Sequence, residues 1–195
     1  MSYMMGDEEH DVDGARSDDP TLLQIRYAQE GDYRSAARAQ RWALWVTGFG
    51  ELPGAIARLV ELDRLGGAFD DARTDLDRSV RALALLREFG PNDNYRHQRG
   101  KVIEEGFLLA AADPDVVRAA GALDLVEALA TDVSLSARTL AAGLSAARHI
   151  GDHDRAAHWT RRIEEGKAMR TKWAAFQKDE DDRVDRMRSK PAVDE

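Results

Sequence analysis

The sequence predicts an all-α protein built from paired helices. Alanine, leucine, arginine and glutamate dominate it, and all four are strong helix formers. No run alternates apolar and polar residues among β-branched neighbours, as a half-buried strand would. One helix–turn–helix pattern also recurs along the chain. We therefore expect a right-handed solenoid of about four antiparallel helix pairs, one of them degenerate, followed by a C-terminal capping helix.

Prolines and glycines mark where these helices begin and end. Pro20 follows Asp19, a preferred capping residue, so the first helix is expected to begin there. The glycines of Gly48-Phe49-Gly50 end the second helix of the first pair. A turn-rich insertion is expected around the sequence FGPNDNYRHQRGK, after the second pair. The other helix boundaries are set by prolines at Pro53, Pro91, Pro114 and Pro191.

Composition limits the classes of protein and compartment that are possible. The 195 residues include no cysteine, which excludes disulfides, a thiol nucleophile and thiolate metal ligands. No apolar run approaches the roughly 20 residues that span a bilayer, and the N-terminus is acidic where a signal peptide would be basic. We expect a cytoplasmic protein with no membrane partner. Its excess of arginine over lysine and its many alanines are typical of GC-rich bacterial genomes.

The net charge of −8 is unevenly distributed. The first 20 residues carry seven acids against Arg16 alone, so residues 1–18 are expected to form a disordered acidic arm. The body that follows has equal numbers of acids and bases. Nucleic acid is not an expected partner, because binding phosphates requires a concentrated basic surface.

The recurring pattern occurs at residues 27–44, 63–80 and 147–164. Its copies share a turn glycine, an aromatic residue or histidine two residues later, and an alanine five residues after the glycine: Gly31, Tyr33 and Ala36; Gly67, Phe69 and Ala72; Gly151, His153 and Ala156. Glycine can adopt the left-handed conformation that ends a helix. Asp32 and Asp152 can cap the next helix. The alanine lets two helices approach closely, and the ring is expected to fill the space between them.

These segments resemble tetratricopeptide repeats, in which pairs of helices about 34 residues long stack side by side. The resemblance covers residues 19–166. It rests on Leu23, Tyr27, Gly31, Tyr33, Ala36 and Ala43 in the first copy, Leu59, Gly67, Phe69 and Ala72 in the second, and Leu140, Gly151 and Ala156 in the last. Residues 102–130 look like a degenerate third repeat. Its turn is Asp-Pro-Asp, which leaves its register open.

The end of a repeat array needs a cap over its last apolar face. Met169, Trp173 and Phe176 share one helical stripe, so residues 167–190 are expected to form this cap and 191–195 a tail. A coiled-coil dimerisation arm is the less favoured alternative, because the apolar spacing does not persist for three heptads.

Catalytic and cofactor motifs fail on spacing. The glycines of GFGELPG follow a helix where a dinucleotide fingerprint needs a strand, and no phosphate-binding loop or metalloprotease motif occurs. We therefore expect neither an enzyme nor a cofactor. His149 and His153, beside Asp152, are weak candidates for a metal site. The favoured alternative places His153 in the packing ring and Asp152 at the helix cap.

The resemblance implies a non-catalytic protein–protein interaction module, such as an adaptor, scaffold or assembly factor, whose first helices line a concave groove. Mapped onto this chain, the groove residues are Thr21, Ile25, Ala28, Gln29, Ala57, Glu61, Arg64, Arg138, Ser145 and Arg148. The expected partner is a protein or peptide. The alternative is a sensor that binds a small peptide or metabolite in the same groove.

Trp42 and Trp45 are candidates for a second contact surface. In the other two copies their places hold charged residues: Arg78 and Arg81, then Arg162 and Glu165. Two hypotheses stay open here. Either Tyr3, Met4 and Met5 of the arm, or Phe49, cover the tryptophans, or the pair binds a partner, for which a homodimer is the simplest case.

Overall fold

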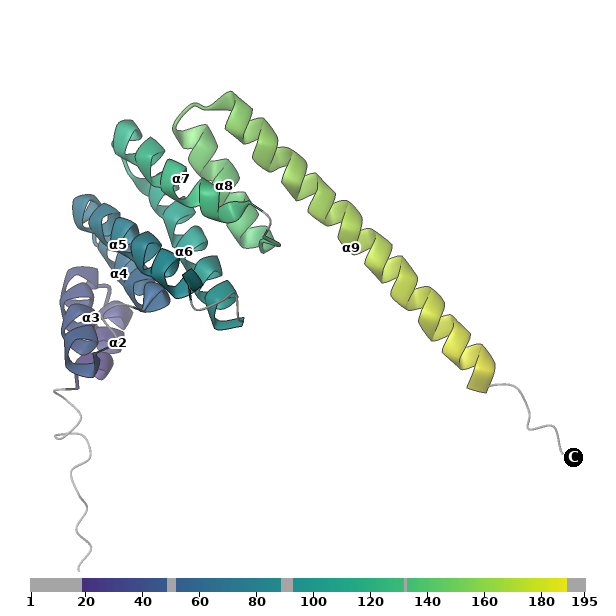
Figure 1. Cartoon of the computed structure of the whole chain (residues 1–195), viewed down its shortest axis with the longest axis horizontal. Coiled ribbons are helices and arrows are strands. Elements are labelled where there is room, and N and C mark those ends of the chain that lie inside the picture. Colours follow the sequence, from purple (N-terminus) through teal and green to yellow (C-terminus); the bar gives the residue numbers. More distant parts are fainter. Residues whose placement is uncertain (1–18, 49–51, 89–92, 132, 189–195) are drawn as a thin grey trace, which may run out of the picture.

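The computed structural model describes residues 19–48, 52–88, 93–131 and 133–188, with side chains up to residue 182. These residues form eight α-helices and no strand, which confirms the all-α prediction (Figure 1). The helices are α2 (Pro20–Gln29), α3 (Tyr33–Thr47), α4 (Pro53–Leu65), α5 (Phe69–Glu88), α6 (Asp93–Ala112), α7 (Val116–Ala130), α8 (Ala137–His149) and α9 (His153–Arg188). The predicted arm 1–18, Phe49 and the tail 191–195 lie outside the described residues.

The three glycine turns share one geometry. Gly31, Gly67 and Gly151 have φ angles of 79°, 72° and 76°, which is the left-handed conformation predicted for them. In each turn the amide after the glycine donates to the carbonyl five residues earlier, at 2.8 to 3.0 Å. The side chain of Asp32 accepts from the Ser35 amide, and that of Asp152 accepts from the Arg155 amide, both at 3.0 Å. The predicted caps are therefore confirmed.

Consecutive helices pack as pairs: α2 with α3, α4 with α5, α6 with α7, and α8 with α9. The first helices of the last three pairs also contact one another, α4 against α6 and α6 against α8, so these three lie side by side (Figure 1). No described helix is long and apolar enough to cross a bilayer.

The main core lies between α4 and the start of α9. Trp159 and Phe107 are fully buried at its centre, with ring centroids 4.9 Å apart in an edge-on arrangement. Gly143 makes room for both rings, because a Cβ atom there would lie 3.1 Å from the Trp159 ring. Gly106 likewise lets α6 approach Val126 of α7. The two glycines thus permit close helix packing at the cost of some backbone entropy.

Arg41 holds the first pair to the second. From α3 it reaches Asp63 of α4 at 2.6 Å and Asp75 of α5 at 3.0 Å. Burial, reinforced by the charge of Asp75 and opposed by that of Arg41, raises the pKa of Asp63 to about 6. Both carboxylates are buried, so the arginine is needed to compensate their charge.

The register of the third pair follows from its capping residue. Asp115 caps α7, accepting from the amides of Val117 and Arg118. Ala119 follows Asp115 by four residues and is fully buried. Ala36 and Ala72, which follow the residues just before α3 and α5 by the same four positions, are fully buried too. Ala119 is therefore the small packing residue of this pair.

The C-terminal helix differs from the prediction of a cap. No break occurs between residues 166 and 167, and α9 is a single helix of 36 residues. Its partner α8 has only 13 residues, and Gly166 already faces Leu140 near the start of α8. The rest of α9 therefore lies beyond the N-terminal end of α8. Its three apolar side chains are exposed there: Met169 by 57%, Trp173 by 60% and Phe176 by 57%. Figure 1 shows α9 continuing away from the other helices. These three side chains do not cap the last pair.

Candidate partner-binding groove

An open cavity of about 250 Å³ lies across α4, α6 and α8. Its lining comes from all three helices: Gly54, Ala57, Arg58 and Glu61; Lys101, Glu104 and Glu105; and Arg138. Gly54 lets α6 approach α4, since its amide donates to Gln98 Oε1 at 2.6 Å and a Cβ atom there would lie 2.1 Å from that oxygen. We call this cavity the groove.

Ion pairs cross the groove from one helix to the next. Arg64 of α4 pairs with Glu105 of α6 at 3.3 Å, and Arg138 of α8 pairs with Glu104 of α6 at 2.9 Å. Arg58 and Glu61 pair within α4. Lys101 is exposed and makes no ion pair with any described residue. The groove thus has paired charges of both signs and one cation, Lys101, without an ion pair among the described residues.

Glu105 has the most perturbed carboxyl group in the groove. Burial raises its pKa to about 7, the nearby charge of Glu61 adds to the rise, and Arg64 opposes it. The side chain of Arg64 is itself only 14% exposed, and its Nε has no hydrogen-bond partner. The floor of the groove therefore carries a carboxyl group that titrates near neutral pH.

The structure brings part of the predicted groove together. Glu61 and Arg138, which lie on different helix pairs, line the same cavity, and Arg64 joins it through Glu105. Ile25 and Gln29 on α2 and Arg148 on α8 are exposed but do not line it.

The α6 side of the groove was missed by the sequence prediction. Lys101, Glu104 and Glu105 occupy it, and the open register of the third repeat left them unassigned. The sequence does contain the signal that could have placed them: Asp115 followed four residues later by Ala119 repeats the spacing from Asp32 to Ala36.

The tryptophans of α3 lie on an exposed face. Trp42 is 46% exposed, Trp45 81% and Val46 57%. Buried residues of the same helix, such as Ala43 and Leu44, face the neighbouring helices instead. The predicted cover from Tyr3, Met4, Met5 or Phe49 falls outside the described residues.

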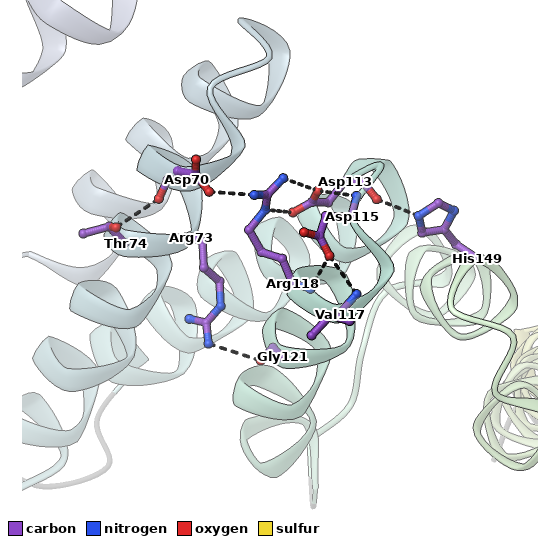
Figure 2. Close-up of polar contacts among 9 residues, drawn as sticks. All are labelled: Asp70, Arg73, Thr74, Asp113, Asp115, Val117, Arg118, Gly121 and His149. Carbon is purple, nitrogen blue, oxygen red and sulfur yellow. Dashed lines mark hydrogen bonds and ion pairs between the residues drawn. The ribbon is translucent and has the colours of Figure 1, made fainter.

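The structure gives His149 a structural hydrogen bond and leaves the side chain of His153 exposed. His149 Nε2 donates to the Asp113 carbonyl oxygen at 2.7 Å, so it joins α8 to the turn between α6 and α7 (Figure 2). The expectation that His153 fills the packing ring is wrong, because its side chain is exposed. Among the residues that the structure describes, no three His, Asp or Glu side chains converge to hold a metal ion.

Arg118 organises the turn that lacks a glycine. Its Nε and Nη2 donate to the two carboxylate oxygens of Asp113, at 2.5 and 2.7 Å, and its Nη1 donates to Asp70 of α5 at 2.6 Å (Figure 2). The Asp115 amide also donates to Asp113, at 2.9 Å. These bonds join the Asp-Pro-Asp turn to α5 and α7, and the His149 bond to the Asp113 carbonyl joins the same turn to the groove helix α8.

No family model, curated protein or solved structure matches this chain. Its function is therefore argued from the groove and the exposed surfaces.

Proposed function

We propose that this chain is a non-catalytic protein–protein interaction module of the tetratricopeptide-like type, and that its groove binds an extended segment of a partner protein. The observation that carries the proposal is the open groove across three adjacent helices, with charges of both signs along it. Extended peptides bind such surfaces through side chains that meet complementary charges at successive positions.

The charges of the groove support a ligand with charges of both signs. Lys101 has no ion-pair partner among the described residues, so an acidic side chain of the ligand can pair with it without displacing a protein group. Arg138 is 76% exposed, which leaves it accessible to the same acidic residue or to one a few residues away. Basic ligand side chains would meet Glu61 and Glu104. The proposed ligand is a peptide segment of mixed charge that places an acidic residue at Lys101.

A sensor of small metabolites is the less supported alternative. The cavity is smaller than the roughly 300–1,000 Å³ of a pocket that encloses a drug-sized ligand, and its lining is charged where such pockets are mostly apolar. An open, ionic surface suits a ligand that continues beyond the cavity on both sides.

The proposal is tested by capture of partners from the native cell. The wild type is compared with Lys101→Glu/Arg138→Glu and with a matched control, Arg87→Glu/Arg161→Glu, which reverses two exposed charges outside the groove. Mass spectrometry is expected to identify proteins retained by the wild type and the control but lost from the groove variant.

Equal retention of every captured protein by all three forms would contradict binding in the groove. Thermal stabilisation by small metabolites, with no protein captured by the wild type at high bait occupancy, would favour the sensor instead.

A further inference from the structure

The exposed part of α9 carries an apolar stripe of three large side chains. Met169, Trp173 and Phe176 follow one another on one face of the helix, beyond the end of α8. The rings of Trp173 and Phe176 contact each other edge-on, with centroids 5.8 Å apart. Together with Lys172, the stripe lines a shallow depression on the helix surface. Clustered exposed aromatic residues of this kind are typical of binding surfaces.

Opposite charges flank this stripe on the helix. Residues 167–172 include three bases and no acid: Lys167, Arg170 and Lys172. Residues 177–182 include one base and four acids: Lys178, Asp179, Glu180, Asp181 and Asp182. The two six-residue segments therefore carry net charges of +3 and −3. A second helix of the same sequence is complementary to this arrangement only when it runs in the opposite direction.

We propose that the stripe binds the α9 helix of a second copy of this chain in an antiparallel, two-fold symmetric pair. Placing Trp173 against Phe176 of the second copy brings Arg170 to the same side of the seam as Asp181, and Lys172 to the same side as Asp179. The two-fold symmetry repeats each contact. A parallel pair would instead place the basic segments together and the acidic segments together. Charged residues beside an apolar seam determine partner and direction in this way in coiled coils.

The pair is expected to be weak. Three large apolar side chains from each copy bury less than the roughly 1,600 Å² of a standard interface, so the dissociation constant is expected in the micromolar range, on the order of 10 μM. The interaction is also expected to weaken with salt, because the flanking charges are exposed. This inference depends on α9 and is independent of the ligand of the groove.

Sedimentation velocity of the full chain over a range of concentrations tests the stripe. The wild type is expected to form a reversible dimer, and Trp173→Ser/Phe176→Ser to weaken it by about tenfold or more with an unchanged circular dichroism spectrum. Leu85→Ser/Val117→Ser, which removes exposed apolar side chains elsewhere, is the matched control and should leave the dimer unchanged. A wild type that stays monomeric at about 200 μM, well above the expected constant, or an equal loss in the control, would overturn the proposal.

Charge reversal tests the direction of the helices. Arg170→Glu and Asp181→Lys should each weaken the dimer, because each places like charges on the same side of the seam. The double variant Arg170→Glu/Asp181→Lys should recover the wild-type dissociation constant to within about threefold, since the pair is restored with its signs exchanged. In a parallel dimer each single change would instead lower the repulsion between like segments, so neither would weaken association and the double variant would associate more tightly than the wild type. That pattern would refute the antiparallel arrangement.

Discussion

At the scale of single residues, Asp113 shows how a buried carboxylate substitutes for a turn glycine. Its side chain is fully buried, yet it accepts hydrogen bonds from Arg118 and from the Asp115 amide. Burial disfavours its charged form, but these hydrogen bonds outweigh burial, so the pKa of Asp113 lies below its usual range. The turn between α6 and α7 thus depends on one ionised group.

We predict that Asp113→Asn destabilises the protein by about 2–4 kcal/mol at pH 7, because it leaves Arg118 without its buried partner. A carboxyl group whose pKa is lowered by folding stabilises the fold above its unfolded pKa, near 4, and loses that contribution as the pH falls through the folded value. The difference between the two proteins should therefore shrink towards pH 3. Urea unfolding at both pH values measures it.

Asp115→Asn is the control for this prediction. Asp115 is an exposed helix cap, and asparagine caps helices about as well as aspartate, so the change should cost less than about 0.5 kcal/mol. Equal destabilisation by the two substitutions would contradict the role assigned to the Asp113–Arg118 pair.

The contribution of Glu105 to the stability of the fold depends on pH with the opposite sign to that of Asp113. Its folded pKa of about 7 is above the ordinary glutamate value, so the folded state binds the proton more tightly than the unfolded state. The stability that Glu105 contributes is complete below about pH 4.5 and is lost as the pH rises through 7.

We predict that Glu105→Gln reduces the loss of stability between pH 5 and pH 8 by about 1–3 kcal/mol relative to the wild type. Glu104→Gln, on the same helix, should retain most of the wild-type pH dependence, because the charge of Glu104 raises the pKa of Glu105 less than burial and the charge of Glu61 do. Unfolding free energies at the two pH values test this. The same pH dependence in the wild type and in Glu105→Gln would show that this carboxyl group is not the one that titrates.

At the scale of elements, the turns were more predictable than the ends of the helices. Left-handed glycine and the aspartate caps are local chemistry, so Gly31, Gly151, Asp32 and Asp152 could be assigned from sequence. The path of α9 could not. The apolar stripe at Trp173 is compatible with either a capping helix or an exposed helix. Which of the two forms depends on how far α8 extends alongside α9, and this is known only from the packing of the two helices.

Helix α3 presents the exposed face that the repeat comparison indicated. Trp42 and Trp45 stand where other copies have charged residues, and both are exposed. We predict that Trp42→Arg/Trp45→Glu changes the free energy of unfolding by less than about 1 kcal/mol, whereas Leu44→Arg, which buries a charge, prevents folding. Circular dichroism during urea unfolding measures both.

The same double variant separates the two apolar surfaces. Because self-association is assigned to α9, Trp42→Arg/Trp45→Glu should sediment as the wild type does. Loss of the fold in this variant would place the tryptophans in the core, and loss of the dimer would move the self-association surface to α3.

At the scale of the whole molecule, the groove arises from contacts between residues far apart in the chain. The residues preceding α5 and α7, Ala68 and Asp115, are 47 positions apart, whereas the corresponding residues of the other neighbouring pairs are 36 and 37 apart. This insertion hid the register of α6. Glu61 and Arg138 were predicted on the groove. Lys101 and the two glutamates of α6 were missed because the longer spacing obscured the match between Asp115–Ala119 and Asp32–Ala36 that could have placed α6.

The central claim, that the groove binds a peptide segment of mixed charge, is tested most directly by calorimetry with a peptide selected from a random library on the wild-type protein. The peptide is expected to contain an acidic residue and to lose about tenfold or more in affinity for Lys101→Glu/Arg138→Glu, while Arg87→Glu/Arg161→Glu binds it within about twofold of the wild type. An affinity that is unchanged by the groove substitutions would contradict the claim.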